Sequence, residues 1–207
     1  MCFSATASFT ASAALGLMGV ATLVKTKNKK SWPLFAVPLA FGAQQFIEGL
    51  LWLSLKNGPS LTLPMTYAFL FFAFLFWPIY MPVAAYIMEP EKIRRQVMFL
   101  LGILGAVVGV LLYVNFVRNP EAAQILNRCL FYPDQIPYPS VLGYLYVIAT
   151  IGPGMISSQK IIRIFSVLVL VFALIAWIVY TRDFTSVWCF FAAIISLVLY
   201  FYPEKKV

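Results

Sequence analysis

The chain has 207 residues, of which 62% are hydrophobic and 11% charged, and its mean hydropathy is +0.90. This composition leaves too little polar surface to cover a soluble globule, so it predicts an integral membrane protein whose main partner is the lipid bilayer. The net charge of +8 does not indicate nucleic-acid binding, because the basic residues form short clusters between apolar runs.

Seven apolar runs approach the roughly 20 residues that a helix needs to cross about 30 Å of hydrocarbon. No signal-peptide pattern precedes the first run, so we expect that helix to remain in the protein. The predicted helices cover residues 5–24, 33–55, 63–88, 97–117, 140–158, 163–181 and 184–202. The sequence thus predicts an all-α membrane protein, a single domain over 1–207 formed by a bundle of seven transmembrane helices.

The basic residues between these helices predict the orientation. Eleven of the fifteen lysines and arginines lie in four segments, at 25–30, 91–96, 159–163 and 204–207. By the positive-inside rule these segments are cytoplasmic, which places the N-terminus outside and the C-terminus in the cytoplasm. The segment 118–139 then becomes an outer loop, and its prolines favour irregular structure there.

Glu48, in the second predicted helix, is the only acidic residue well inside a predicted span. A carboxylate in hydrocarbon costs several kcal/mol unless it is protonated, paired or hydrated. Gln44, Gln45 and Trp52 share a broad helix face with it. We therefore expect Glu48 to face the bundle interior in the outer half, near the hydroxyl groups of the first helix. Gln44, Gln45 and Trp52 are candidate ligand-binding residues around it.

The three cysteines are all predicted on the outer side. Cys2 precedes the first helix, Cys129 lies in the outer loop, and Cys189 follows Trp188 near the outer end of the last helix. Two thiolates and a carboxylate suit a copper or zinc ion, so Cys2, Glu48 and Cys189 are candidate metal ligands, with Trp188 in the wall of the site. Cys129 is a candidate disulfide partner or extra thiol, and the pairing stays open.

Four motifs carry a resemblance to a known family. MCFSATASF at the start, FGAQQFIEGLLW in the second helix, FWPIYMP in the third and SVWCFFAA in the seventh occur in this order. Together they resemble an uncharacterised family of small bacterial integral membrane proteins with an N-terminal MCFSA signature. The resemblance implies a multi-pass protein of the bacterial inner membrane. It also implies that Cys2, Glu48 and Cys189 belong to family motifs.

Three hypotheses for the function remain open. We favour an outer-side site for a copper or zinc ion or a small ligand, used for binding, redox or enzymatic chemistry. The first alternative is a proton-coupled transporter of a small solute or ion that uses Glu48, with a broken fifth helix at TIGPGM, residues 150–155. The second alternative is a structural or assembly subunit with a disulfide between Cys2 and Cys189.

Some cofactors are excluded by the residues present. The chain has no histidine, which excludes a haem ligated by histidine, and the seventh predicted helix has no lysine for a retinal Schiff base. The sequence predicts neither catalytic residues nor an oligomeric state.

Overall fold

The structure is a computed structural model that describes residues 4–126, 129–133, 141–179 and 184–201, and in this part of the chain helices dominate. The all-α fold class is therefore confirmed. The α-helices are α1 (Ala5–Lys25), α2 (Trp32–Phe35), α3 (Val37–Asn57), α4 (Thr62–Leu70), α5 (Trp77–Met88), α6 (Lys92–Arg118), α7 (Val141–Ile156), α8 (Lys160–Val179), α9 (Phe184–Ser196) and α10 (Val198–Phe201). Two 3-10 turns, η1 (Lys29–Ser31) and η2 (Pro59–Leu61), and a π-helix, η3 (Phe71–Phe76), complete them.

Within the described residues, six helices are long and apolar enough to cross a membrane. They cover Ala5–Lys25, Lys29–Lys56, Thr62–Met88, Lys92–Arg118, Lys160–Val179 and Phe184–Phe201. The fifth helix, α7, is described over only 16 residues, which is about 24 Å of helix. The fourth, α6, begins five residues before the predicted start, because the charged residues ahead of its apolar run are helical as well.

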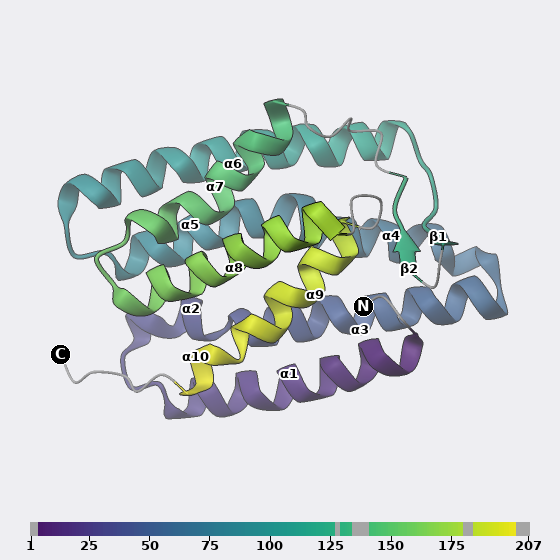
Figure 1. Ribbon diagram of the computed structural model, residues 1–207, viewed down its shortest axis with the longest axis horizontal. Coiled ribbons are helices and arrows are strands. Elements are labelled where there is room, and N and C mark those ends of the chain that lie inside the picture. The colour runs from purple at the N-terminus through teal and green to yellow at the C-terminus, as the bar shows by residue number, and fades with distance from the viewer. Residues whose placement is uncertain (1–3, 127–128, 134–140, 180–183, 202–207) are drawn as a thin grey trace.

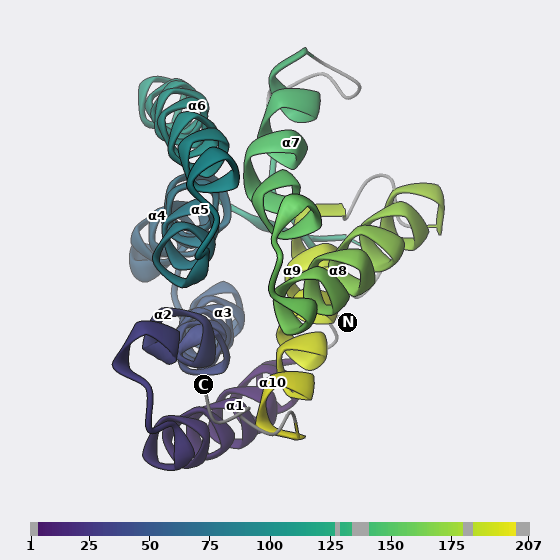
Figure 2. The same ribbon diagram turned by 90° about the vertical axis from the view of Figure 1, so that its left-hand side faces the viewer.

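The helices run back and forth along one long axis (Figure 1). α1 begins at one end of the bundle, and α10 finishes at the opposite end. Seen along the bundle, α6, α5, α3 and α1 follow one another in one layer, with α7, α8 and α9 beside them (Figure 2). α9 packs against both α3 and α8, so the last long helix reaches the centre of the molecule.

A π-helix interrupts the third long helix between α4 and α5. The π-turns of η3 leave carbonyl groups outside the regular α-helical pattern. One of them, the Ala73 carbonyl, accepts a hydrogen bond from the Tyr146 hydroxyl of α7. The irregular segment is thereby joined to the second layer.

Glycines let α6 approach this third helix very closely. A Cβ atom added at Gly105 would lie 1.9 Å from the Pro78 carbonyl oxygen, and one at Gly109 would lie 2.8 Å from the Phe74 carbonyl oxygen. Such distances are far below van der Waals contact, so only glycine fits at Gly105 without a shift of the backbone.

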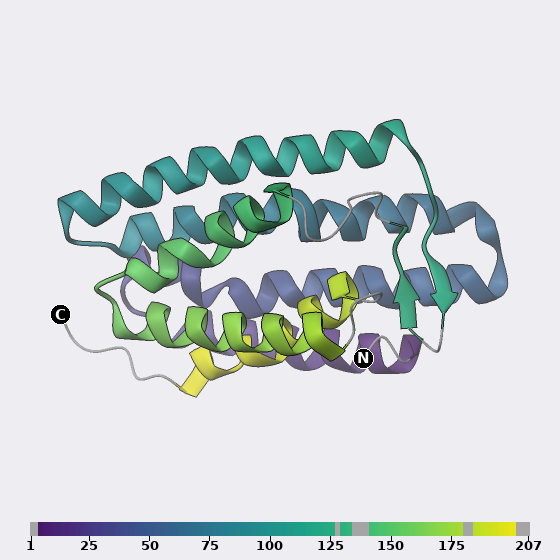
Figure 3. The same ribbon diagram turned by 45° about the horizontal axis from the view of Figure 1, so that its top comes forward.

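The segment between α6 and α7, predicted to be an outer loop, contains a short antiparallel hairpin, so the expectation of irregular structure is wrong for its first half. β1 (Gln124–Leu126) pairs with β2 (Cys129–Phe131) across one end of the bundle (Figure 3). Cys129 and Leu130 are buried. The ring of Tyr132 stacks on Phe69 of α4 at 4.7 Å. The loop therefore forms part of the core, while residues 134–140 lie outside the described residues.

The expected break at TIGPGM is also wrong, since α7 continues through Pro153 as far as Ile156. Gly154 serves packing there. A Cβ atom at this position would lie 1.7 Å from the Ser166 hydroxyl oxygen of α8. The two helices therefore touch where a discontinuous backbone was expected.

Glu89 links the connection between α5 and α6 to the connection between α7 and α8, at the end of the bundle where α10 finishes. Its side chain is buried. It accepts hydrogen bonds from the Ser157 hydroxyl, the Ser158 backbone N–H and the Ser158 hydroxyl, all between α7 and α8. Burial pushes the pKa of Glu89 up, but these bonds and one from the Glu91 backbone together hold the pKa below its ordinary value.

Candidate functional site

One face of α3 places four polar or amphipathic side chains in the bundle interior. Gln44, Gln45, Glu48 and Trp52 are all buried, and Glu48 is only 1% exposed. Their spacing of three, four and seven residues keeps them on one side of the helix, as the sequence indicates. Because α1 and α9 pack against this helix, the face looks onto neighbouring helices.

The carboxyl group of Glu48 meets hydroxyl groups from both neighbours. Ser186 of α9 donates a hydrogen bond of 2.6 Å from its Oγ to Glu48 Oε1. Ser8 of α1 and Gln45 lie near the same carboxyl group, but outside normal hydrogen-bond geometry. Ser8 reaches it because α1 and α3 lie close together, with the Ser12 hydroxyl 2.8 Å from the Gly42 carbonyl oxygen. We call Ser8, Gln44, Gln45, Glu48 and Ser186 the polar layer.

Several buried atoms in the polar layer make no hydrogen bond of normal geometry to any described residue. They are Ser8 Oγ, Gln44 Nε2, and both Oε1 and Nε2 of Gln45. Trp52 Nε1, one turn along α3 from Glu48, belongs to the same group. Most buried polar groups in proteins have a partner, and leaving one without costs free energy. Five such atoms on two adjoining helices indicate a place for water or a polar ligand.

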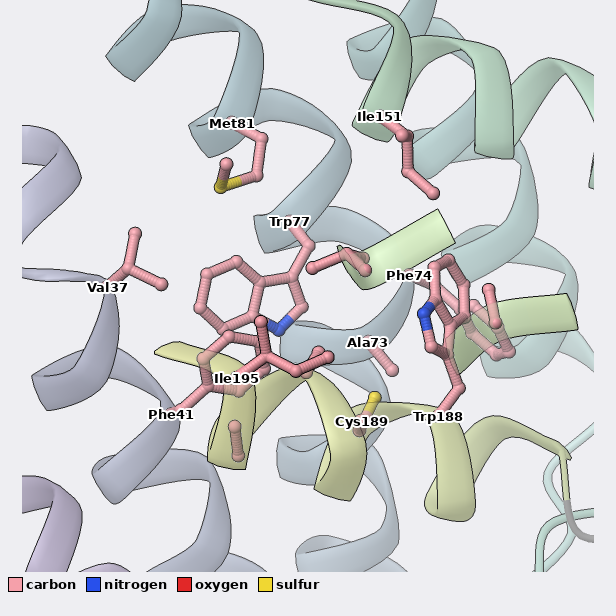
Figure 4. Packing of buried hydrophobic residues seen from close by; sticks show 14 of the residues in the cluster. Val37, Phe41, Ala73, Phe74, Trp77, Met81, Ile151, Trp188, Cys189 and Ile195 are labelled. Carbon is pink, nitrogen blue, oxygen red and sulfur yellow. The ribbon is translucent and has the colours of Figure 1, made fainter. Parts of the chain in front are cut away.

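Gln44 links the polar layer to the aromatic core. Its Oε1 accepts a hydrogen bond of 2.8 Å from Trp77 Nε1 of α5. The indole in turn stacks on Phe41 with ring centres 3.9 Å apart. Figure 4 shows this pair facing the α9 side chains Trp188 and Cys189 across the interior. The amide orientation of Gln44 is thereby fixed.

A small cavity lies beside this aromatic pair. Its volume is about 40 Å³, and Trp77, Tyr146, Ser166, Trp188 and Cys189 are among its lining residues. About three water molecules would fill that volume. Trp188 Nε1 is buried without a hydrogen bond to any described residue. The cavity therefore offers a donor from Trp188 and a thiol from Cys189 next to mostly apolar walls.

Only two of the three predicted metal ligands, Glu48 and Cys189, lie among the residues that the structure describes. Cys2 lies outside them, and Cys129 is buried in β2, in the hairpin. Cys189 follows Ser186, the hydrogen-bond partner of Glu48, by three residues on α9. This spacing is about 4.5 Å along the helix axis. Among the described residues, no group of three His, Cys, Asp or Glu side chains is close enough to hold a metal ion.

Comparison with known proteins places the chain in a family. A family of unknown function, DUF6629, matches residues 1–207. The chain belongs to this family. Membership in DUF6629 confirms the expectation of an uncharacterised family and assigns no activity. No curated protein and no solved structure gives a significant match to the chain.

Two residues of the site in this DUF6629 chain could not be identified from the sequence. Ser186 and Trp77 hydrogen-bond Glu48 and Gln44 over separations of 138 and 33 residues. A signal for each was present, because Ser186 stands in the same motif as Cys189, and Trp77 stands in the third-helix motif. What the sequence lacked was the pairing of helix faces that makes them neighbours.

Proposed function

We propose that the protein is a multi-pass protein of the bacterial inner membrane, with its N-terminus outside and its C-terminus in the cytoplasm. Six long apolar helices support the membrane location. The helix ends support the orientation. Lys25, Lys29, Lys92 and Lys160 all lie at the end of the bundle where α10 finishes, at or beside the ends of α1, α6 and α8. Positive charge gathered at one end is typical of the cytoplasmic side.

We further propose that the polar layer binds a monovalent cation, which exchanges with a proton on Glu48. The observation that carries this proposal is the set of buried polar atoms around the Glu48 carboxyl group that make no hydrogen bond to any described residue. The oxygen atoms available are those of Ser8, Gln45, Glu48 and Ser186. Carboxylate, amide and hydroxyl oxygens are the donors that hard cations prefer.

The charge of the layer limits what it holds. Glu48 is its only ionisable side chain, so one positive charge is neutralised when the carboxylate is ionised. A divalent ion would leave an uncompensated charge in a buried place, at a cost of several kcal/mol. A proton or an alkali cation balances the carboxylate, and this exchange is the chemistry of proton-coupled ion transport.

A copper or zinc ion held by Cys2, Glu48 and Cys189 is the second candidate. The observation that favours it is the position of Cys189, buried on α9 one turn from the Glu48 partner Ser186. Metal analysis of protein purified without chelator tests it. The candidate requires about one equivalent of copper or zinc in the wild type and its loss in Cys189→Ser.

The experiment for the cation site compares Glu48→Gln with Glu91→Gln in purified protein in nanodiscs. We expect Na⁺ or K⁺, exchanged for N-methylglucamine at constant ionic strength, to raise the melting temperature of the wild type and of Glu91→Gln. The same exchange should leave Glu48→Gln unchanged, since this variant keeps the shape but cannot carry a negative charge. Proton release on cation addition, followed with a pH dye, should vanish in Glu48→Gln alone. An equal cation response in Glu48→Gln would overturn the proposal.

A further inference from the structure

An open groove lies where α5 ends and α6 begins. Its volume is about 520 Å³. Tyr86 of α5 forms one wall, and the first two turns of α6 form the other. The residues that line it are Tyr86, Lys92, Arg95, Gln96, Phe99 and Leu100. We call this the α5–α6 groove.

The end of the groove nearest the connection is positively charged. Lys92 and Arg95 lie one turn apart on the same face of α6. The ion pair at this connection joins Arg94 to Glu91 at 2.6 Å. Neither Lys92 nor Arg95 forms an ion pair with any described residue. Arg95 instead lies over the Tyr86 ring, 5.8 Å from its centre.

The backbone adds to this positive charge. The groove sits on the first turn of a 27-residue helix, and Glu91 at its N-cap makes no side-chain hydrogen bond to the first backbone N–H groups. These groups point out of the helix start and favour a negatively charged partner there.

The other end of the groove is apolar and continues toward the middle of α6. Phe99 and Leu100 are 58% and 63% exposed. The Phe99 ring lies 6.2 Å from that of Tyr86. The groove therefore changes, within two turns of one helix, from two cations to an aromatic and aliphatic surface.

We propose that the α5–α6 groove binds an anionic phospholipid, with the phosphate at Lys92 and Arg95 and an acyl chain along Phe99 and Leu100. This inference rests on the proposed membrane location, with this end at the cytoplasmic leaflet, and is independent of the cation site at Glu48. Charge complementarity selects an anion, and the apolar half selects an anion that carries a hydrocarbon chain. A free phosphate ion would leave that half uncovered.

The experiment measures lipid retention by native mass spectrometry of protein in detergent, titrated with phosphatidylglycerol or phosphatidylcholine. We expect the wild type to retain one phosphatidylglycerol in preference to phosphatidylcholine. Lys92→Gln with Arg95→Gln should weaken phosphatidylglycerol binding about 30-fold, since each basic residue near a membrane surface contributes on the order of 1 kcal/mol. The matched control is Lys29→Gln with Lys30→Gln, which removes the same charge at the same end, outside the groove.

Equal losses in the two double variants, or no lipid preference in the wild type, would overturn the inference. Phe99→Ala tests the chain contact. It should weaken phosphatidylglycerol retention, and millimolar inorganic phosphate should not displace the lipid from the wild type. Displacement by phosphate alone would contradict a lipid site. Carbonate extraction of native membranes tests the membrane location separately. Glu48→Gln should retain phosphatidylglycerol like the wild type, because the lipid site is independent of the cation site.

Discussion

The hydrogen bond from Ser186 to Glu48 joins two residues that lie 138 positions apart in the chain. Both side chains are buried, so bulk solvent does not compete for this hydrogen bond. This contact helps to accommodate a carboxyl group among apolar helices. It also makes α9 part of the candidate site, because α3 alone supplies Glu48 with glutamine neighbours but no hydroxyl group.

Replacing Ser186 with alanine should lower the free energy of unfolding by about 1 kcal/mol, because the carboxyl group loses its donor. The same change should weaken the cation response. Ser196→Ala is the matched control on the same helix, since among the described residues that buried hydroxyl bonds only the carbonyl of Ala193 one turn away. Thermal unfolding in nanodiscs measures both variants. Equal losses would contradict a special role for Ser186.

Which side chains face inward on α3 could be predicted from the sequence, and which residues they meet could not. Helical spacing puts Gln44 and Glu48 on one face, and the cost of burying a charge in lipid turns that face inward. The partners Ser186 and Trp77 depend on how distant helices pack. Periodicity within one helix contains no information about that packing. Cys2, the residue on which the metal hypothesis depends, lies outside the described residues.

At the scale of the elements, the close pair of α6 and the third long helix depends on glycine. Gly105 meets the Pro78 carbonyl oxygen, a backbone atom that moves only with its whole helix. Gly102, one turn earlier on α6, meets only the Pro82 side chain at an ordinary 3.5 Å. The two positions therefore differ in the space around them and share the same helix.

Gly105→Ala should destabilise the protein by about 3 kcal/mol, because overpacking displaces backbone. Gly102→Ala should change stability by less than about 1 kcal/mol, and the helix preference of alanine favours it. Thermal or denaturant unfolding of the two variants checks the difference. If Gly105→Ala melts with the wild type, the two helices are not as close as the structure places them.

Helices defined by a long apolar run could be predicted from the sequence. Elements of only a few residues could not. The runs at 63–88 and 163–181 correspond to helices in the structure. The hairpin of β1 and β2 has only three residues per strand, too few for a pattern to emerge beside the prolines that follow. Nothing in the sequence indicates the partners of Glu89, because its hydrogen bonds come from a second connection 68 and 69 residues later.

Glu89 also predicts a response to pH. Since its pKa is lower in the folded protein than in the unfolded chain, its contribution to stability is present above the ordinary glutamate pKa and is lost as pH falls through the lowered value. The melting temperature of the wild type should therefore fall on acidification below about pH 4.5. Glu89→Gln should be less stable at neutral pH and show a shallower fall. Parallel curves for both proteins would argue against this role.

The molecule as a whole has two chemically different ends. The end with the hairpin carries few basic residues in the described part of the chain, and the other end gathers most of them. If the charge sets the orientation, a cysteine placed in the hairpin faces outside and one at the start of α6 faces the cytoplasm.

Gln124→Cys should react with a membrane-impermeant maleimide added to intact cells, and Lys92→Cys should react only after the cells are opened. Both positions are exposed. The parent protein with its native cysteines serves as the background, which is subtracted. Labelling of Lys92→Cys in intact cells would reverse the proposed orientation and, with it, the leaflet assigned to the α5–α6 groove.

Because α9 packs against α3, the polar layer is completed only late in synthesis of the chain. The second long helix leaves the ribosome carrying Glu48, and more than a hundred further residues must follow before Ser186 emerges. If the chain inserts into a bilayer as proposed, the carboxyl group enters it without the Ser186 donor, and the protonated form is the one that insertion tolerates best. Only when the last long helix inserts against α3 does the polar layer close. The last long helix thus supplies the contact that completes the polar layer. A chain that ends before α9 has the earlier helices but lacks the Ser186 hydroxyl.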